Sequence, residues 1–81
     1  MYLAVKKVIP TDDYKLIITF ENNETKIFDM HPYLNKGIFK ELNDINLFKT
    51  VKVAFDSIEW LNEADIDPET LYEESKTIKN V

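Results

Sequence analysis

The sequence predicts an α+β fold: a mostly antiparallel sheet, a meander of about five strands, with short helical turns in the middle and a C-terminal helix. Three observations lead to this prediction. Apolar and polar residues alternate in the N-terminal part of the chain, as in half-buried strands. The spacing becomes helical around residues 34–42. Finally, the segment from Ile58 to Tyr72 has the pattern of strand, turn, strand and capped helix.

Three strands are expected in the N-terminal part. Residues 2–9 are mostly apolar, and Pro10 with the turn-forming side chains after it ends the strand. Residues 14–20 place aromatic and aliphatic side chains at alternate positions, which is the period of a strand buried on one face. Residues 25–30 should pair antiparallel with that strand across Asn22-Asn23, because asparagine tolerates the left-handed conformation that a tight hairpin requires.

The middle of the chain is expected to form short helical turns and two further strands. Pro32 and Gly37 interrupt the helical spacing, so one long helix is not expected. Residues 51–55 alternate well enough to form a fourth strand. Residues 57–60 follow as a fifth strand, across a turn near Asp56.

The C-terminal helix has a clear start signal. Asp67 offers a side-chain acceptor at the N-cap, Pro68 suits the first helical position, and Glu69 places a carboxylate near the positive end of the helix dipole. The helix is expected to run toward Lys76. Lys76 and Lys79 would then lie where cations stabilise a helix C-terminus.

Length and composition indicate one small cytoplasmic domain. A chain of 81 residues corresponds to a single domain spanning residues 1–81. It contains no cysteine, so it has neither a disulfide framework nor a thiolate nucleophile, which fits a reducing compartment. The N-terminus lacks the order of a secretory signal, and no segment has the length needed to cross a bilayer.

The charge balance disfavours nucleic acid and membrane surfaces as partners. The net charge is −5, which repels phosphate backbones and anionic lipids at long range. Every basic residue is lysine, so the chain lacks the guanidinium fork that reads guanine edges. A coding bias toward lysine, asparagine and isoleucine explains the missing arginine equally well. We expect no direct contact with nucleic acid and no membrane association.

The only histidine, His31, supports the one catalytic hypothesis. Asp29 precedes it by two residues and would orient it as a proton shuttle, with Asp65 as a further acid or base. The alternative is structural, because a lone histidine before a proline at the end of a strand more often closes a turn by hydrogen bonding. No nearby serine or threonine forms a recognisable nucleophile motif with His31. The structural interpretation is preferred, so no catalytic residue is assigned.

Two further acidic patterns are also better explained by structure than by ligands. Asp65, Asp67 and Glu69 alternate like the start of a calcium loop, but Thr70 replaces the glycine and Lys76 the bidentate glutamate of that loop. We therefore expect no metal and no cofactor. The acidic side chains of the terminal helix are expected to form a solvated face, with a basic protein partner as the alternative role.

The aromatic residues allow two interpretations. They could stack on nucleic acid bases, or they could fill the core of a small domain; the acidic charge favours the core. The residues concerned are Tyr2, Tyr14, Phe20, Phe28, Phe39, Phe48, Phe55 and Trp60.

The order of these motifs resembles the domain-of-unknown-function 2442 family of small bacterial proteins. The motifs that carry the resemblance are Tyr-x-Leu-x-x-x-Phe at residues 14–20, Phe-Asp at 28–29, Gly-Ile-Phe-Lys-Glu-Leu at 37–42, Ile-Glu-Trp at 58–60 and Asp-Ile-Asp-Pro-Glu-Thr-Leu-Tyr at 65–72. The resemblance covers nearly the whole chain and is most specific at its end. It implies an α+β fold with a mostly antiparallel sheet and a C-terminal helix.

Two turns depart from the pattern of that family. The hairpin after Phe20 usually carries Asp-Gly or Asn-Gly and here has Asn22-Asn23, while the turn after Trp60 commonly carries Pro-Asn-Gly and here has residues 61–63 as Leu-Asn-Glu. Both turns replace glycine with a residue that is less stable at positive φ. The geometry of these turns is therefore open.

The resemblance implies no activity, so the expected function rests on physical grounds. A small antiparallel sheet has edges that must be protected, and a protein partner or self-association would cover them. We expect a non-catalytic protein-interaction or regulatory module that forms a homo-oligomer or binds another protein. The alternative is a small enzyme that uses His31 with Asp29 or Asp65 as acid and base.

Overall fold

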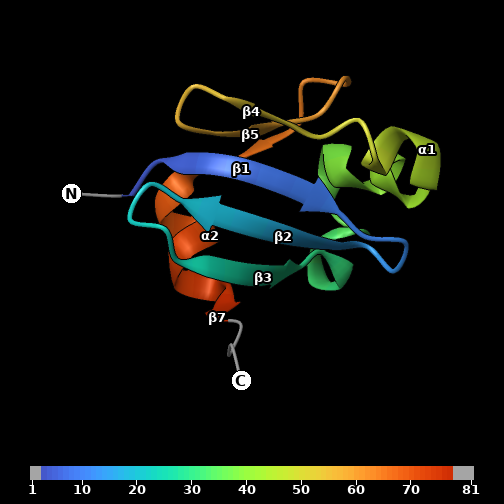
Figure 1. Cartoon of the computed structure of the whole chain (residues 1–81). Coiled ribbons are helices and arrows are strands. Elements are labelled where there is room, and N and C mark those ends of the chain that lie inside the picture. The colour runs from blue at the N-terminus through green and yellow to red at the C-terminus, as the bar shows by residue number, and fades with distance from the viewer. Residues whose placement is uncertain (1–2, 78–81) are drawn as a thin grey trace.

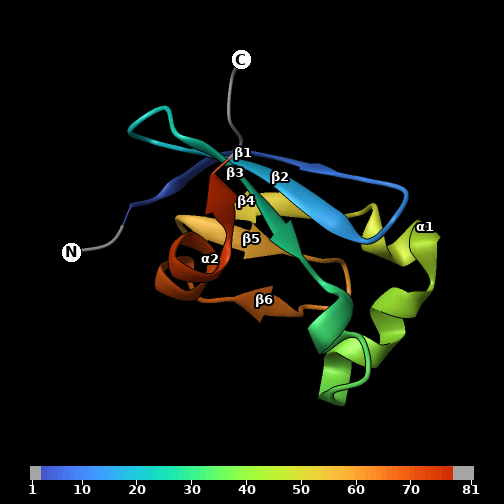
Figure 2. The same ribbon diagram turned by 90° about the horizontal axis from the view of Figure 1, so that it is seen from below.

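Two antiparallel sheets share one core in the computed structural model, which describes residues 3–77 (Figures 1 and 2). The first sheet has the strand order β1-β2-β3-β7 and the second has the order β4-β5-β6. Their strands are β1 (Val5–Pro10), β2 (Lys15–Phe20), β3 (Thr25–Asp29), β4 (Lys52–Ala54), β5 (Ser57–Glu59), β6 (Asp65–Ile66) and β7 (Lys76–Thr77).

Short helical segments connect the two sheets. The 3₁₀ turns η1 (His31–Tyr33) and η2 (Gly37–Asn43) and the single turn α1 (Ile45–Phe48) lead from β3 to β4. The helix α2 (Pro68–Glu74) follows β6. The α+β prediction, including the short turns in the middle and the C-terminal helix, is confirmed.

The strand arrangement differs from the expected meander of about five strands, because the described residues form antiparallel sheets of four and three strands. Residues 31–48 carry the chain away from the edge of β3, so β4 starts a second sheet instead of extending the first (Figure 2). The strands β6 and β7 each contain two residues, which is too short for an alternating pattern to be recognised. The expected strand over residues 2–9 is observed as β1, and residue 2 lies outside the described part of the chain.

The helix α2 begins as predicted but ends earlier. Asp67 accepts a hydrogen bond from the Thr70 backbone N–H at 3.4 Å, and Pro68 is the first helical residue. Ser75 then turns to an extended conformation, and Lys76 pairs with β3 instead of continuing the helix. Lys79, expected near the helix C-terminus, lies outside the described residues.

The two turns without glycine adopt the same hydrogen-bonded form. In the first, the Phe20 N–H donates to Glu24 O, the Asn23 N–H to Phe20 O, and the Glu24 N–H to Asn22 Oδ1. In the second, Trp60, Asn62, Glu63 and Ala64 make the equivalent bonds. The Trp60 N–H donates to Ala64 O, the Glu63 N–H to Trp60 O, and the Ala64 N–H to Asn62 Oδ1. The left-handed residue of each turn, Asn23 at φ 69° or Glu63 at φ 69°, takes the place of glycine.

The core lies between the sheets and under α2. Strand β2 is buried at alternate positions, as its pattern predicted. Leu71 of α2 is fully buried, and the rings of Phe20 and Tyr72 meet edge to face at 5.1 Å between centroids. The largest fully buried side chains are those of Trp60, Phe20, Phe28, Phe48, Leu16, Ile18, Met30, Leu42, Ile58 and Leu71.

Trp60 has the largest of the fully buried side chains in this core. Its side chain is 1% exposed, and its indole Nε1–H donates to the Phe48 carbonyl oxygen at 2.9 Å. The rings of Phe39 and Phe48 lie at 6.3 and 6.2 Å from the indole. This hydrogen bond joins the end of α1 to the residue that follows β5, so it connects the helical segment to the second sheet.

Replacing Trp60 with phenylalanine should lower the free energy of unfolding by about 2–4 kcal/mol, because the change leaves a cavity and a buried carbonyl without its donor. Urea denaturation followed by circular dichroism measures this loss. Leu61→Ala is the matched control: Leu61 is 68% exposed, so its truncation should cost less than about 0.5 kcal/mol. Equal effects of the two substitutions would contradict the central role of Trp60.

Candidate functional site

The tip of the β4–β5 hairpin carries an exposed aromatic ring. Ala54 pairs with Ser57, so Phe55 and Asp56 form a two-residue loop. Their φ angles are 50° and 67°, and positive φ at both central residues is the mark of a type I′ turn. Such turns favour asparagine and glycine, whereas a bulky residue at positive φ is strained. The Phe55 side chain is 92% exposed, so its expected place in the core was wrong.

A backbone hydrogen bond from the turn to β1 holds the hairpin against the first sheet. The backbone N–H of Val5, in β1, donates to the carbonyl oxygen of Asp56 at 2.9 Å. Val5 itself is buried in the core. The position of Phe55 is therefore set by the packing of two sheets and not by contacts of its own ring, which faces solvent.

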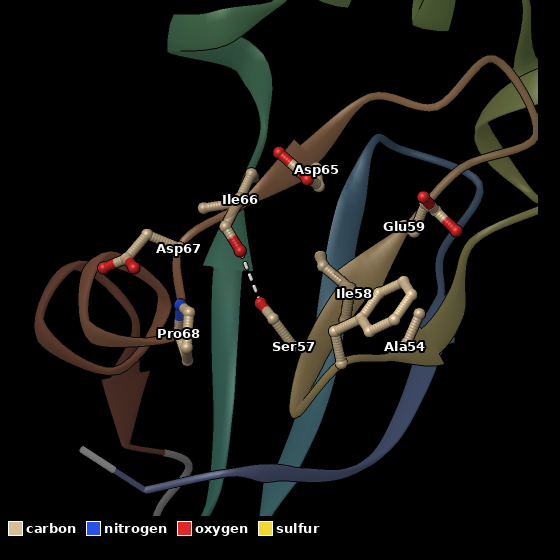
Figure 3. A pocket seen from close by; sticks show the side chains of 9 residues that line it. Ala54, Ser57, Ile58, Glu59, Asp65, Ile66, Asp67 and Pro68 are labelled. Carbon is tan, nitrogen blue, oxygen red and sulfur yellow. Dashed lines mark hydrogen bonds between the residues drawn. The ribbon is translucent and has the colours of Figure 1, made fainter.

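A shallow depression lies beside this tip (Figure 3). Its volume is about 140 Å³. The hydroxyl of Ser57 donates to the carbonyl oxygen of Ile66, which ties β5 to β6 in the floor of the site. The residues that line the depression are Ala54, Phe55, Ser57, Ile58, Glu59, Asp65, Ile66, Asp67 and Pro68.

Three carboxylates border the depression. Glu59 and Asp65 are direct cross-strand neighbours in the antiparallel pair β5–β6, a position in which like charges destabilise a sheet. Asp67 adds a third carboxylate at the start of α2, where it caps the helix. Across residues 3–77 the ion pairs involve Asp13, Asp29 and Asp12, and none of them reaches this depression. Lys52 lies opposite Glu59 on the other side but is not within ion-pair distance of it.

The Asp29–His31 pair lies in the first sheet, at the end of β3. Asp29 Oδ1 accepts the His31 backbone N–H at 2.9 Å and lies 2.5 Å from His31 Nδ1. The backbone hydrogen bond from His31, followed by that from its ring, lowers the pKa of Asp29 below its ordinary value. The two side chains are 51% and 53% exposed, so solvent screens this pair. The ring of Tyr14 meets the imidazole edge to face at 5.9 Å.

A second shallow depression lies near Asp29 but does not include His31. It has a volume of about 150 Å³ and is lined by Lys15, Ile27, Asp29, Glu74 and Lys76. The Tyr33 hydroxyl donates to Glu74, which raises the pKa of Tyr33 to about 12. The carboxylate of Glu74 is therefore already occupied by a hydrogen bond from the protein itself.

The structure does not bring Asp65 to the histidine. Asp65 belongs to β6 of the second sheet, and in the described residues no hydrogen bond or ion pair joins it to His31. The calcium-like trio is also divided, since Asp67 caps α2 and Glu69 lies in the first turn of the helix. Within residues 3–77, no three metal-ligating side chains come together as a metal site would require.

Comparison with known proteins assigns the chain to a family. Residues 5–77 match the family described as "Protein of unknown function (DUF2442)". The chain belongs to the DUF2442 family. This confirms the resemblance drawn from the motifs at residues 14–20, 37–42 and 58–72. The searches of curated proteins and of solved structures each returned no match.

The helices of this DUF2442 chain are short. In the described part of the chain, no helix has the length and apolar character to cross a membrane.

Sequence patterns assigned Phe55 to the core and gave Glu59 no role in a site. The alternation Val53-Ala54-Phe55 favoured a strand through residue 55, which would have placed Phe55 on the same face as Val53. The strand ends one residue earlier, at Ala54, so Phe55 becomes the first loop residue. One feature of the sequence could have revealed the exposed position of Phe55. The expected strands 51–55 and 57–60 leave only one residue between them, and a hairpin turn needs more, so a residue from a strand end has to join the turn.

Phe55→Asn should stabilise this DUF2442 chain. Asparagine suits the left-handed conformation, so the substitution relieves strain of about 1 kcal/mol without removing a buried contact. Thermal unfolding should show a midpoint raised by about 4–8 °C. Phe55→Ala removes the same ring while keeping an unfavourable residue at positive φ, so it should not give this increase. A lower midpoint for Phe55→Asn would show that the ring itself stabilises the fold.

Asp29→Asn should reduce the dependence of stability on acid. Because the pKa of Asp29 is lowered in the folded chain, its ionised form stabilises the fold above the ordinary value of 3.8, and this stabilisation is lost as the pH falls through the lowered pKa. The effect should stay below about 1 kcal/mol, since the pair is half exposed. Urea unfolding at pH values on both sides of 3.8 measures it.

His31→Ala provides the matched control for this measurement. The largest contribution to the lowered pKa is the hydrogen bond from the His31 backbone N–H, which the alanine variant keeps. This variant should therefore retain most of the acid dependence. A complete loss in His31→Ala would assign the effect to the imidazole.

Proposed function

We propose that this protein is a non-catalytic protein-interaction or regulatory module that acts in the cytoplasm. The observation that carries the proposal is Phe55, an aromatic ring that is 92% exposed and held at a φ of 50° beside a depression. Strain in a backbone that does not serve packing is a feature of functional sites. Exposed aromatic side chains are also enriched among the residues that anchor protein interfaces.

The sheet edges add support to this proposal. Strand β4 is an edge of the second sheet, and its Val53 side chain is 40% exposed. An edge strand with exposed apolar side chains offers both unpaired backbone groups and hydrophobic surface to a partner. Phe55 follows β4 directly in the sequence, so the ring lies at the end of this edge strand. Self-association of two copies, or binding of a different protein, would cover it.

A small enzyme remains the second candidate function. Its support is the 2.5 Å distance between His31 Nδ1 and Asp29 Oδ1, which is the geometry of an imidazole oriented by a carboxylate. Asp65, the other proposed acid or base, would have to act without this pair, because it lies in the other sheet. If His31→Ala left every reaction in a screen of hydrolase and lyase substrates unchanged, this candidate would be abandoned.

Photocrosslinking in the cell that naturally makes the protein tests the interaction role. The photoreactive p-benzoylphenylalanine replaces Phe55 in one variant and Ile38 in the control; Ile38 is 45% exposed but lies in η2, away from the hairpin. We expect covalent adducts with protein from position 55 and few from position 38, because only the hairpin surface would be covered by a partner.

Light scattering of the purified chain over a range of concentrations separates the two kinds of partner. A concentration-dependent dimer identifies a second copy, whereas a strict monomer that still forms adducts identifies a different protein. A strict monomer without adducts at position 55 would refute the interaction proposal.

A further inference from the structure

We propose that two copies of this chain associate through the outer face of the first sheet, with Ile9 of each copy packed against Ile27 of the other. The outer face is the side of β1, β2 and β3 that points away from the core. The inference goes beyond the proposed function, because it concerns a surface other than the hairpin around Phe55 and commits to one partner.

An apolar row crosses the outer face. Ile9 lies directly opposite Ile17, and Ile17 lies directly opposite Ile27, in the registers of β1–β2 and β2–β3. Residues that pair in this way share one face of a sheet. Leu16 and Phe28, which pair on the opposite face, are 0% and 1% exposed and belong to the core. The three isoleucines therefore point outward.

No helix or strand of the described chain covers this row. The helix α2 and the second sheet lie on the core side of the first sheet (Figures 1 and 2). Ile9 is 44% exposed, whereas Val8, its neighbour in β1, packs against the core. Three adjacent aliphatic side chains on an open sheet leave apolar surface in water, and association would remove it.

The second depression lies on the same face, beside Ile27. Lys15 pairs with Asp29 across β2 and β3, and Lys76 pairs with Ile27 across β3 and β7, so these four lining residues share the outer face. The volume of the depression, about 150 Å³, is enough for a group of the size of benzene, and hence for one isoleucine side chain.

The outer face is complementary to a second copy of itself. Ile9 and Ile27 are the neighbours of Ile17 on its two sides, so a two-fold axis along β2 through Ile17 would place Ile9 of each copy over Ile27 of the other. Each exposed Ile9 would then enter the depression of its partner. The strands of the two sheets would run nearly parallel, which is one of the preferred arrangements of packed sheets.

The charges around the depression also fit a second copy. Each chain has a net charge of −5, so two copies repel each other at long range. Around the depression, Lys15 and Lys76 balance Asp29 and Glu74. Lys15, which would approach its counterpart near the axis, already pairs with Asp13 at 3.5 Å. A strongly acidic or basic partner gains nothing from this balance, whereas an apolar surface with an equally balanced rim, such as the face itself, fits it.

Sedimentation equilibrium of the full chain tests the association. One small sheet lies at the low end of interface sizes, so we expect a dissociation constant between about 10 µM and about 1 mM. Added salt should tighten the dimer, because it screens the repulsion between two acidic chains. A dimer that salt weakens would depend on charge pairs and would contradict the proposed interface.

Ile9→Thr, with Ile38→Thr as its control, separates this face from the rest of the surface. Threonine keeps the branched shape that suits a strand and removes apolar surface. Ile9 and Ile38 are 44% and 45% exposed, and Ile38 lies in η2, outside the first sheet. The dissociation constant should rise at least about fivefold in Ile9→Thr, where two symmetric contacts are lost, and change less than about twofold in Ile38→Thr.

Isotope-filtered nuclear magnetic resonance on the unmodified sequence locates the contact independently of any variant. In a mixture of ¹³C-labelled and unlabelled chains, nuclear Overhauser effects between copies should join the methyl groups of Ile9 and Ile27. Within one chain these residues are two strand spacings apart, about 10 Å, which is too far for a strong effect.

A chain that is monomeric at about 1 mM would overturn the inference. So would a dimer without the Ile9–Ile27 effect, an unchanged dissociation constant in Ile9→Thr, or an equal rise in both threonine variants. Contacts between copies at residues 54–59, or weakening by Phe55→Asn alone, would place the second copy at the hairpin instead. If the chain stays monomeric while photocrosslinks form at position 55, the interaction role stands and this inference is wrong.

Discussion

The burial of one indole between the helical segment and the second sheet is the constraint on which the fold depends. Trp60 donates its N–H to the Phe48 carbonyl, and the Trp60 backbone also closes the turn that leads to β6. The same residue therefore holds α1, the end of β5 and the start of β6 in one arrangement. In a domain this small the core supplies a narrow margin of stability, so a single large side chain can carry much of it.

Polar groups in the interior are satisfied, which contrasts with the surface of the second sheet. Among the described residues, no buried side-chain nitrogen or oxygen lacks a hydrogen-bond partner; the nearly buried Lys26, for example, donates to the Tyr72 carbonyl at 2.7 Å and lies over the Tyr72 ring. At the hairpin, by contrast, an aromatic residue occupies a strained turn, and two acidic residues, Glu59 and Asp65, pair across neighbouring strands. Departures of this kind from local preference tend to mark functional surfaces.

Local patterns predicted most of the elements, and long-range pairing accounts for what they missed. The alternation in β2 and the start of α2 depend on neighbouring residues, so both were found at the expected positions. The division into two sheets depends on where residues 31–48 lead the chain, which no local pattern encodes. Strand β7 exists because Lys76 and Thr77 return to β3 after the helix, a contact between residues far apart in the sequence.

The sequence alone determined the α+β class, the family, the start of the capped helix and the position of the first hairpin turn at Asn22-Asn23. Each of these follows from residue type and short-range spacing. Tertiary structure decided which side chains are exposed at the candidate site and which residues pair there. Pairing of Ala54 with Ser57 moved Phe55 from an expected core strand to an exposed turn, and the β5–β6 register placed the acidic residues Glu59 and Asp65 opposite each other. Both results depend on strand register, and a shift of one residue in register reverses which side chains are buried.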